Sequence, residues 1–335
     1  MVCATFEIQR GTFDSFASEW DKLAQQTPGA SVFLSYAWHE TWWDQFGAGA
    51  EHLLLGFRDA GRLVAIAPLM IRGDVVSFLG GTDLVDYHDV LAGDIDHATL
   101  AGELFEALAA IDGWNSAEFG SLPDWSPFVS ALPESAKLRG WRAEVSIEDV
   151  APGLEIPDSW DDYLAGLGRK DRHELRRKLR RLEGAGDVSH AEYTSPEDVE
   201  VHLDEFFRLH RMSTPDKAEF MTPEREQFFR AASARLADDC GVRLSFTRLD
   251  GKSLAASLSF DYCGRRLVYN SGYDPEYRNL SVGFLNHALF IRQCIDDRVE
   301  YADFLRGSER YKYNLGATDH TIYRVVVRRQ GEQSN

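Results

Sequence analysis

The sequence contains little cysteine. Its four cysteines, Cys3, Cys240, Cys263 and Cys294, lie far apart and show neither a C-x-x-C motif nor the Cys/His spacing of a zinc site. This pattern argues against a disulfide framework and against a structural metal, and we expect the thiols to be buried or incidental. No Ser or Cys nucleophile motif indicates a covalent enzyme intermediate either.

Long apolar runs and basic residues are also scarce. No apolar run reaches the roughly 18 residues that a membrane span requires, and residues 1–7 lack the basic and apolar regions of a signal peptide. We therefore expect a cytoplasmic protein without a membrane span. The 36 Lys and Arg residues against 54 Asp and Glu give a formal net charge of −18, which disfavours DNA and anionic lipid as partners. Any anionic ligand must therefore meet a local basic patch.

A hairpin of two alternating strands occurs twice in the chain. The first joins residues 53–58 to 62–69, and the second joins 243–249 to 252–258, each through a turn that contains Asp and Gly. Each hairpin follows apolar residues at helical spacing and precedes a third strand. These segments are residues 13–23 and 75–79 in the first copy, and 199–210 and 267–270 in the second.

The matching order of segments indicates two copies of one unit, and 335 residues are enough for two domains. We predict a mixed α/β fold with a first half over 1–150 and a second half over 151–335. The boundary is expected at residues 150–157, where two prolines and a glycine interrupt the periodicity.

Residues 266–283 have the pattern of an anion-binding loop. An alternating strand at 266–270 leads through a turn at 272–275 into the segment from Arg278 to Gly283, which opens a helix that ends near Asp296. The first amides of a helix have no partner within the helix, and small residues there leave them accessible. The segment therefore predicts a cradle for phosphate groups.

The strongest local excess of positive charge is at residues 168–183. Eight Arg or Lys residues against three acids give a local charge of +5. Leucines at helical spacing form an apolar stripe, so we expect the basic residues on the opposite face of a helix. This face either contacts phosphates of a donor or acceptor, or is simply solvated, and the sequence favours neither.

A further strand at 299–305 is followed by the polar segment 306–313. On these features the sequence resembles the GNAT acyltransferase superfamily, in particular the BioF2-like or CelD-like acetyltransferases related to the Fem peptidyltransferases. In GNAT enzymes a Gln/Arg-x-x-Gly-x-Gly/Ala loop binds the coenzyme A pyrophosphate. Arg278 and Gly283 keep the ends of that pattern here, and Ser281 replaces its middle glycine.

The resemblance implies two tandem GNAT-like halves, each a twisted, mostly antiparallel sheet flanked by helices. It also implies acetyl-CoA or another acyl-CoA as co-substrate, without a metal. The first half has no phosphate loop after its third strand, so we expect the donor in the second half and the acceptor at the first. The expected donor-binding residues are Tyr269, Asn270 and Ser271 on the strand and Arg278, Asn279, Leu280, Ser281, Val282 and Gly283 in the loop.

The polar run Asp86, Tyr87, His88 and Asp89 follows a strand and a double glycine. Asp86, His88 or Asp89 could take a proton from an acceptor amine, and Tyr87 could bind the acceptor. A loop whose Asp residues cap the backbone is an equally good interpretation from the residues alone. The resemblance favours substrate binding.

The segment 311–313 lies where GNAT enzymes often place a tyrosine that protonates the departing thiolate, and Tyr311 is the candidate for this role. Asp303, Arg306 and Lys312 are expected to bind the substrate in the same cleft. A packed aromatic residue is the alternative interpretation for Tyr311.

These features together predict direct acyl transfer to an amine or sugar hydroxyl of a small-molecule, saccharide or peptide acceptor, in polysaccharide or cell-envelope metabolism. One alternative is a Fem-type peptidyltransferase that uses aminoacyl-tRNA, for which the basic helix is favourable and the net charge is not. Another alternative is a noncatalytic GNAT-fold binding module.

Overall fold

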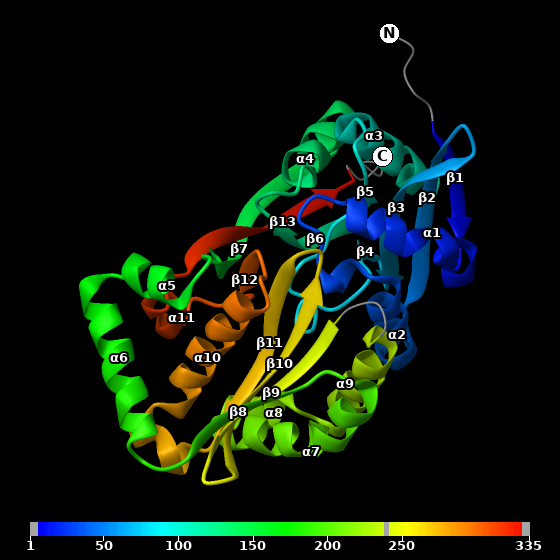
Figure 1. Cartoon of the computed structure of the whole chain (residues 1–335). Coiled ribbons are helices and arrows are strands. Elements are labelled where there is room, and N and C mark those ends of the chain that lie inside the picture. Colours follow the sequence, from blue (N-terminus) through cyan, green and yellow to red (C-terminus); the bar gives the residue numbers. More distant parts are fainter. Residues whose placement is uncertain (1–5, 238–240, 330–335) are drawn as a thin grey trace. The chain divides into compact units, whose positions relative to one another are not determined.

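A computed structural model describes residues 6–237 and 241–329 and divides them into two compact units (Figure 1). The first unit contains residues 6–150 and 320–329, and the second contains residues 151–319. Both mix strands and helices, which confirms the predicted fold class. Among the described helices, none is both long and apolar enough to cross a membrane.

The first unit is built on the strand order β1-β2-β3-β4-β6-β13, and the short strand β5 pairs with β3. Its strands are β1 (Glu7–Gly11), β2 (Glu51–Asp59), β3 (Arg62–Arg72), β4 (Val75–Phe78), β5 (Leu91–Ala92), β6 (Ser116–Pro123) and β13 (Thr318–Arg328). Its helices are α1 (Phe13–Gln26), η1 (Val32–Leu34), α2 (Tyr36–Phe46), α3 (His97–Ala109) and α4 (Phe128–Leu138).

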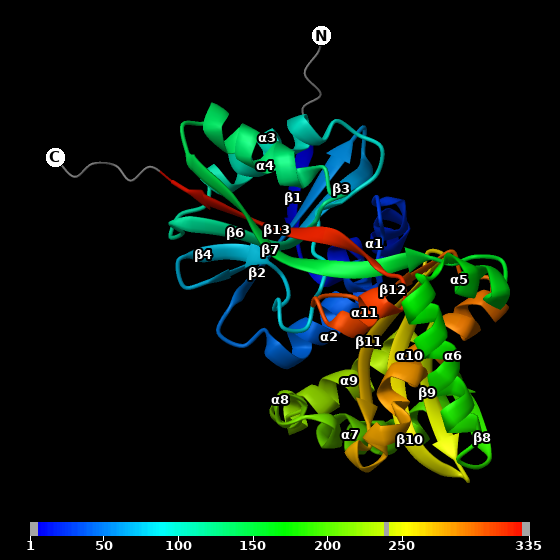
Figure 2. The ribbon, with the colours of Figure 1, turned by 90° about the vertical axis from the view of Figure 1, so that its left-hand side faces the viewer.

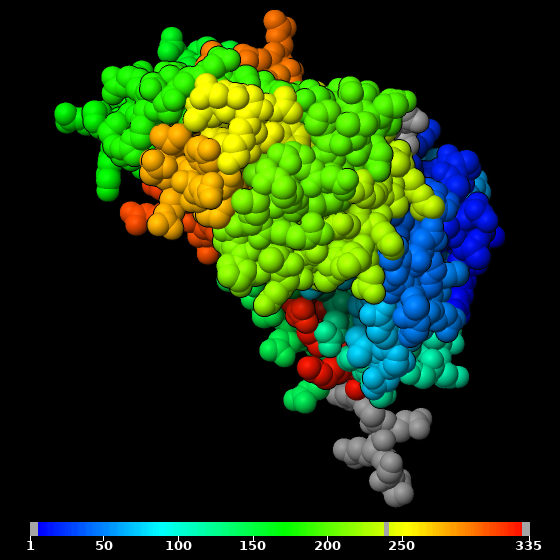
Figure 3. Space-filling model, turned by 90° about the horizontal axis from the view of Figure 1, so that it is seen from below, coloured from blue at the N-terminus to red at the C-terminus, as the bar shows by residue number. Residues whose placement is uncertain are grey.

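The second unit is built on the order β12-β11-β10-β9-β8, with the end of β7 beside β12. Its strands are the end of β7 (Arg142–Glu155, of which residues 151–155 belong to this unit), β8 (Val188–Tyr193), β9 (Gly241–Leu249), β10 (Lys252–Tyr262), β11 (Arg265–Tyr273) and β12 (Tyr301–Asp303). Its helices are α5 (Trp160–Gly166), α6 (Arg169–Glu183), α7 (Pro196–Ser213), α8 (Pro215–Phe220), α9 (Pro223–Leu236), η2 (Pro275–Leu280), α10 (Val282–Asp296) and α11 (Arg310–Asn314). Helices α7, α8 and α9 form one continuous surface of this unit, yellow-green in Figure 3.

The two units repeat one arrangement of strands. In each, a hairpin and a third strand are antiparallel, and the third strand then pairs in parallel with a fourth, β4 with β6 and β11 with β12. Both hairpin turns have two residues with positive φ, Ala60-Gly61 and Asp250-Gly251, as two-residue turns that match the strand twist require. The tandem arrangement predicted from the sequence is therefore confirmed.

The predicted extent of the second half differs from the structure at one place. Residues 320–328 of β13 belong to the first unit, where β13 pairs with β6. The division between the units lies between residues 150 and 151, within the predicted boundary region, and β7 is continuous through it to Glu155. The proline is tolerated because Pro152 lies at the end of the ladder with β12, where its carbonyl accepts from the Phe304 amide at 2.9 Å.

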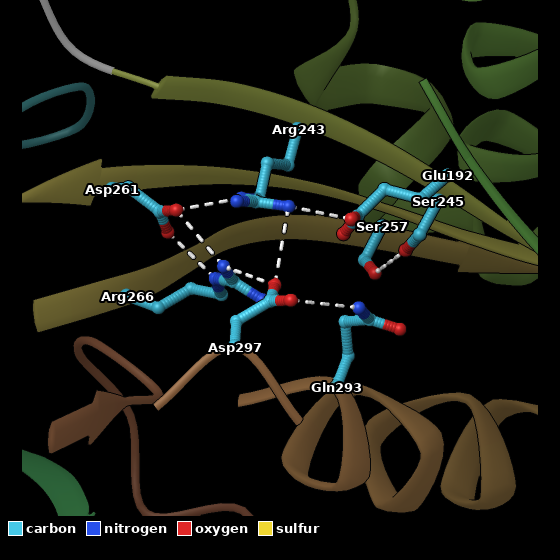
Figure 4. Close-up of polar contacts among 8 residues, drawn as sticks. All are labelled: Glu192, Arg243, Ser245, Ser257, Asp261, Arg266, Gln293 and Asp297. Carbon is cyan, nitrogen blue, oxygen red and sulfur yellow. Dashed lines mark hydrogen bonds and ion pairs between the residues drawn. The ribbon is translucent and has the colours of Figure 1, made fainter. Parts of the chain in front are cut away.

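A network of ion pairs joins β9, β10 and β11 to the end of α10 (Figure 4). The buried Arg266 guanidinium donates to Asp261 at 2.6 and 2.9 Å and to Asp297 at 2.8 Å. Arg243 pairs with the same two carboxylates and with Glu192. The network therefore holds the C-terminal end of α10 against the start of β11.

We expect Arg266→Met to lower the free energy of unfolding by about 3 kcal/mol, because it removes the buried cation between two carboxylates, which then keep only Arg243 as a cationic partner in this network. Urea denaturation measures the change. Arg10→Met is the control, since Arg10 pairs with Glu51 on the surface and such pairs contribute about 1 kcal/mol or less. Equal losses in the two variants would contradict the assigned role of Arg266.

Candidate functional site

The segment before α10 presents bare amides, as predicted. Ser281, the residue before the helix, is in the left-handed region with φ 60° and ψ 35°, and its side chain does not cap the helix. The first amides of α10 therefore have no side-chain cap. Since a helix N-terminus also carries partial positive charge, this end of α10 can bind an anion.

Helix α6 brings two cations to this segment. It lies beside α10 (Figures 1 and 2). Lys178 donates from Nζ to Ser281 Oγ at 3.1 Å, and Arg181 donates from Nη1 to the Asn279 carbonyl at 2.9 Å. The hydroxyl that could have capped α10 is thus bonded to a lysine. Two side chains of the basic helix meet the predicted phosphate loop directly, and their contact with phosphates of a ligand stays a prediction.

Gly283 has a packing role that the sequence did not reveal. A Cβ atom at this position would lie 2.9 Å from Cδ1 of Tyr273, which is closer than atoms approach without movement. The missing side chain therefore lets α10 pack against β11, a common use of glycine at such a junction. Gly283→Glu would displace Tyr273. It would therefore disturb this packing as well as any binding of phosphate.

Strand β11 has an open edge next to this loop. It pairs with β12 only through residues 265–267, and β12 ends at Asp303. Tyr269 is an extra residue in the ladder with β10, because Leu258 pairs with Asn270 and Ser259 with Val268. Beyond this bulge the edge away from β10 has no strand partner among residues 6–237 and 241–329. Such an edge can bind the amides of an extended ligand.

The direction of the backbone groups identifies which residues face the open edge. The Asp274 amide donates to the Leu254 carbonyl of β10 at 2.7 Å. Since successive residues of a strand turn their backbone groups to opposite edges, those of Tyr273 and Ser271 face the open edge. Two contacts agree with this, because the Tyr273 amide donates to Ser213 Oγ at 2.7 Å and Lys217 Nζ donates to the Ser271 carbonyl.

The remaining predicted donor residues differ in their surroundings. The Oδ1 of Asn270 accepts from His210 Nε2 at 3.0 Å, and burial lowers the pKa of His210 to about 4. The Tyr269 ring packs against Phe229 and Phe260. Arg278 is exposed, next to the loop. The strand and loop residues thus lie together around the open edge and the start of α10.

Lys312 holds the loop that follows β12. Its buried ammonium donates to the carbonyls of Leu305, Arg306 and Gly307 at 2.8 to 2.9 Å, and it pairs with Glu309. These contacts use all three of its protons. The structure therefore gives Lys312 a role in shaping the loop, in place of the substrate contact expected from the sequence.

Asp303 is also part of the internal structure. It is buried, its Oδ1 accepts from the Leu305 amide at 2.8 Å, and its Oδ2 pairs with Arg265 at 3.5 Å. The loop contains two residues of positive φ, Leu305 at 56° and Gly307 at 105°. Asp303 and Lys312 together stabilise this conformation, and the half-buried Arg306 lies within it.

Tyr311 faces a histidine that sequence reasoning missed. Its ring stacks on His287 of α10, with centroids 4.6 Å apart and planes 14° apart. Burial first, and the Glu309 carboxylate second, raise the pKa of Tyr311, so its hydroxyl keeps its proton at neutral pH. Burial, with Lys217 and Lys312 nearby, lowers the pKa of His287 to about 3. The pair is therefore neutral, and Tyr311 can donate a proton.

The polar run of the first unit is largely buried. Asp86 is half-buried, whereas Tyr87, His88 and Asp89 are buried, and the His88 ring stacks on Phe78. Asp89 Oδ1 accepts from Ser126 Oγ at 2.9 Å and from the Val90 amide at 2.8 Å. Burial raises the pKa of Asp89 to about 7. These residues and the donor-loop residues belong to different units.

The pKa of Asp89 predicts a pH-dependent stability. Between about pH 4 and pH 7 the folded protein retains a proton that the unfolded chain has released, so rising pH destabilises the fold, and the penalty persists above pH 7. Asp89→Asn can keep the accepting oxygen without this penalty. We expect its advantage in free energy of unfolding over the wild type to be larger at pH 8 than at pH 4.5 by roughly 3 kcal/mol.

Urea denaturation at the two pH values measures this difference. Asp94→Asn is the matched control, because Asp94 is exposed. An advantage of Asp89→Asn that is the same at both pH values would contradict the raised pKa.

Residues 169–313 match a family model described as an acetyltransferase (GNAT) domain. This segment of the chain is a GNAT domain. It contains α6, the predicted phosphate loop, the edge of β11 and the loop held by Lys312, so it includes the site contacts described for the second unit. In the described part of the chain, no group of three or more metal-ligating side chains is found.

Solved structures share the chain's fold over nearly its whole length. FemX has a TM-score of 0.64 at 12% identity, covering 94% of this chain and 96% of its own. The C-terminal domain of a putative lysylphosphatidylglycerol synthetase from Agrobacterium fabrum has a TM-score of 0.60 at 11% identity, covering 94% and 92%. A tandem GNAT protein from the clavulanic acid biosynthesis pathway has a TM-score of 0.53 at 12% identity, covering 98% and 100%. No curated protein sequence matches the chain.

Proposed function

We propose that this GNAT protein is an acyltransferase that takes an acetyl or other acyl group from an acyl-CoA and transfers it directly to an amine or a sugar hydroxyl. The observation that carries the proposal is the loop before α10, where Lys178 and Arg181 contact the segment that leads into the uncapped helix amides. Uncapped amides and two cations suit a diphosphate. The open edge of β11 begins next to it, and the backbone groups there that Ser213 and Lys217 do not bond suit the amides of a pantetheine arm.

In the proposed reaction the acceptor nitrogen attacks the thioester carbonyl carbon, the carbon–sulfur bond breaks, and the electron pair leaves on the coenzyme A sulfur. The ammonium form of an amine must first lose a proton, because only about one free alkylamine in two thousand is neutral at pH 7. We propose that Asp86, His88 or Asp89 of the first unit takes that proton. Tyr87 is proposed to bind the acceptor molecule. Tyr311 is the proposed donor to the departing thiolate.

The acceptor is proposed to be a small molecule, a saccharide or a peptide, in polysaccharide or cell-envelope metabolism. The BioF2-like or CelD-like branch named from the sequence is consistent with this setting. Holding donor and acceptor together supplies much of the expected acceleration, since the reaction needs no covalent enzyme intermediate.

A second candidate is a donor of the aminoacyl-tRNA type, as in the Fem peptidyltransferases. One observation favours it: the first two turns of α6 line a surface hollow with five basic or imidazole side chains. A polynucleotide needs several phosphate contacts in a row, and α6 offers them along its length. The hollow is lined by Arg169, Lys170, Arg172, His173 and Arg176.

Calorimetric titration of the purified chain with acetyl-CoA, and separately with bulk tRNA in low salt, distinguishes these candidates. Micromolar binding of acetyl-CoA supports the first, and thiol release in the presence of amines or sugars then identifies the acceptor class. Salt-dependent binding of tRNA without acetyl-CoA binding supports the second. A chain that binds neither has retained the GNAT fold without this chemistry.

A further inference from the structure

Lys217 and Lys312 interact electrostatically with one another, and they differ in what their protons do. All three protons of Lys312 are donated to loop carbonyls. Lys217, at the start of α8, donates to the carbonyl and the hydroxyl of Ser271. Within the described residues, these two are the acceptors of its ammonium, which leaves one proton for a ligand.

Lys217 changes the polarity of the edge where it lies. The Ser271 carbonyl faces the open edge two residues beyond the bulge at Tyr269. A bare carbonyl is an acceptor and would repel the oxygen of a thioester placed beside it. With Lys217 bonded to that carbonyl, the same position presents an N–H donor and a positive charge. The edge can then bind an acyl oxygen.

Charged and titratable groups approach Lys217 from each element around it. His210 comes from α7, His287 from α10, Glu309 from the loop after β12 and Lys312 from α11. Burial, and to a lesser extent the charge of Lys312, lowers the pKa of Lys217 to about 8, while Glu309 opposes this. Lys217 is therefore mostly charged at neutral pH, and both histidines, whose pKa values are about 4 and 3, are neutral.

Resting on the proposed acyl-CoA function, we infer that Lys217 binds the acyl carbonyl oxygen of the donor and stabilises the negative charge that forms on it during transfer. A positioned cation in a partly desolvated site is well suited to that charge. Lys312 cannot do this without releasing the loop. The two lysines thus divide the tasks, one holding the loop and the other binding the reacting group.

The test compares acetyl-CoA with S-ethyl-CoA, in which a methylene replaces the carbonyl group, by calorimetry. A hydrogen bond from a charged group raises the affinity for a ligand that can accept it by roughly 10- to 100-fold over one that cannot. We expect the wild type to prefer acetyl-CoA by about 10-fold or more. In Lys217→Met the preference should fall to about 3-fold or less, with the affinity for S-ethyl-CoA unchanged.

Two further variants make the comparison specific. Lys217→Arg keeps the charge and should retain part of the preference. Lys137→Met removes an exposed lysine of α4 and should leave both affinities unchanged. Thermal unfolding of Lys217→Met shows whether it is folded, and Ser271→Ala, which keeps the carbonyl, serves as a second, milder variant at the same edge.

The pH dependence adds a second readout. Lys217 loses its charge as the pH rises through its pKa of about 8. The preference of the wild type for acetyl-CoA over S-ethyl-CoA should therefore decline between pH 7 and pH 9.5. A wild type that binds both ligands equally overturns the inference and leaves the proposed function standing. A Lys217→Met protein whose affinity falls equally for both ligands likewise overturns the inference and leaves the proposed function standing. A folded wild type that binds neither ligand refutes the proposed function itself.

Discussion

Lys178→Glu/Arg181→Glu should bind acetyl-CoA at least about 1,000-fold more weakly than the wild type. Each of these cations contacts the segment before α10. A charge-assisted hydrogen bond to phosphate contributes on the order of 1.5–3 kcal/mol. Reversal of charge adds repulsion at the same position. The two changes together therefore cost more binding free energy than the roughly 4 kcal/mol that a 1,000-fold difference in affinity represents. Calorimetry with acetyl-CoA measures the loss.

The control is Arg176→Glu/Arg180→Glu, which changes the net charge of the chain by the same amount. At 100° per residue, positions 176 and 180 lie 200° from Lys178 around α6, on the opposite face. Both arginines are exposed. We expect acetyl-CoA affinity within about 5-fold of the wild type, because exposed charges at a distance are screened by salt. Equal losses in the two double variants would mean that only the overall charge of α6 matters.

A third variant of α6, with three arginines changed, tests the aminoacyl-tRNA alternative. Arg176 lines the surface hollow at the first two turns of α6, whereas Lys178 and Arg181 contact the loop. Binding of tRNA that disappears in Arg176→Glu/Arg177→Glu/Arg180→Glu, while acetyl-CoA binding stays absent from the wild type, would support that alternative. The two faces of one helix thus separate the two donors experimentally.

The features that could be predicted from the sequence are local in the chain. The hairpins, the strand that precedes α10 and the start of α10 each depend on neighbouring residues and on a turn whose chemistry is visible in the sequence. The basic helix was predicted for the same reason, since charge and leucine alternate within one segment. Repetition of these local features made the tandem arrangement visible.

The features that could not be predicted depend on contacts between distant segments. β13 joins the first unit although it follows the second unit in the chain. Local periodicity in the sequence does not indicate its pairing with β6. Lys217 reaches Ser271 across 54 residues, from a short helix with no motif of its own. Lys312 was predicted to bind substrate because it lies near Tyr311, yet its direction is set by three carbonyls of a loop with left-handed residues.

Lys312→Met should lower the free energy of unfolding by about 4 kcal/mol. The lysine is 2% exposed, so its removal leaves three inward carbonyls without a donor, and each costs on the order of 1–3 kcal/mol when buried. The loop can relax and expose some of these carbonyls to water, so the total loss of stability stays below the sum of the three penalties. The exposed Lys170→Met is the control, and we expect a change within about 0.5 kcal/mol there. Urea denaturation measures both.

Hydrogen exchange locates the effect of Lys312→Met. The Leu305 amide, which donates to Asp303 in the wild type, should exchange faster in the variant, because φ values of 56° at Leu305 and 105° at Gly307 are unfavourable once the lysine no longer holds the carbonyls. Amides of β10, which lie in the centre of the sheet, should lose protection only as far as global stability falls. A destabilised variant with unchanged exchange at Leu305 would show that Lys312 stabilises the unit as a whole and does not set the shape of this loop.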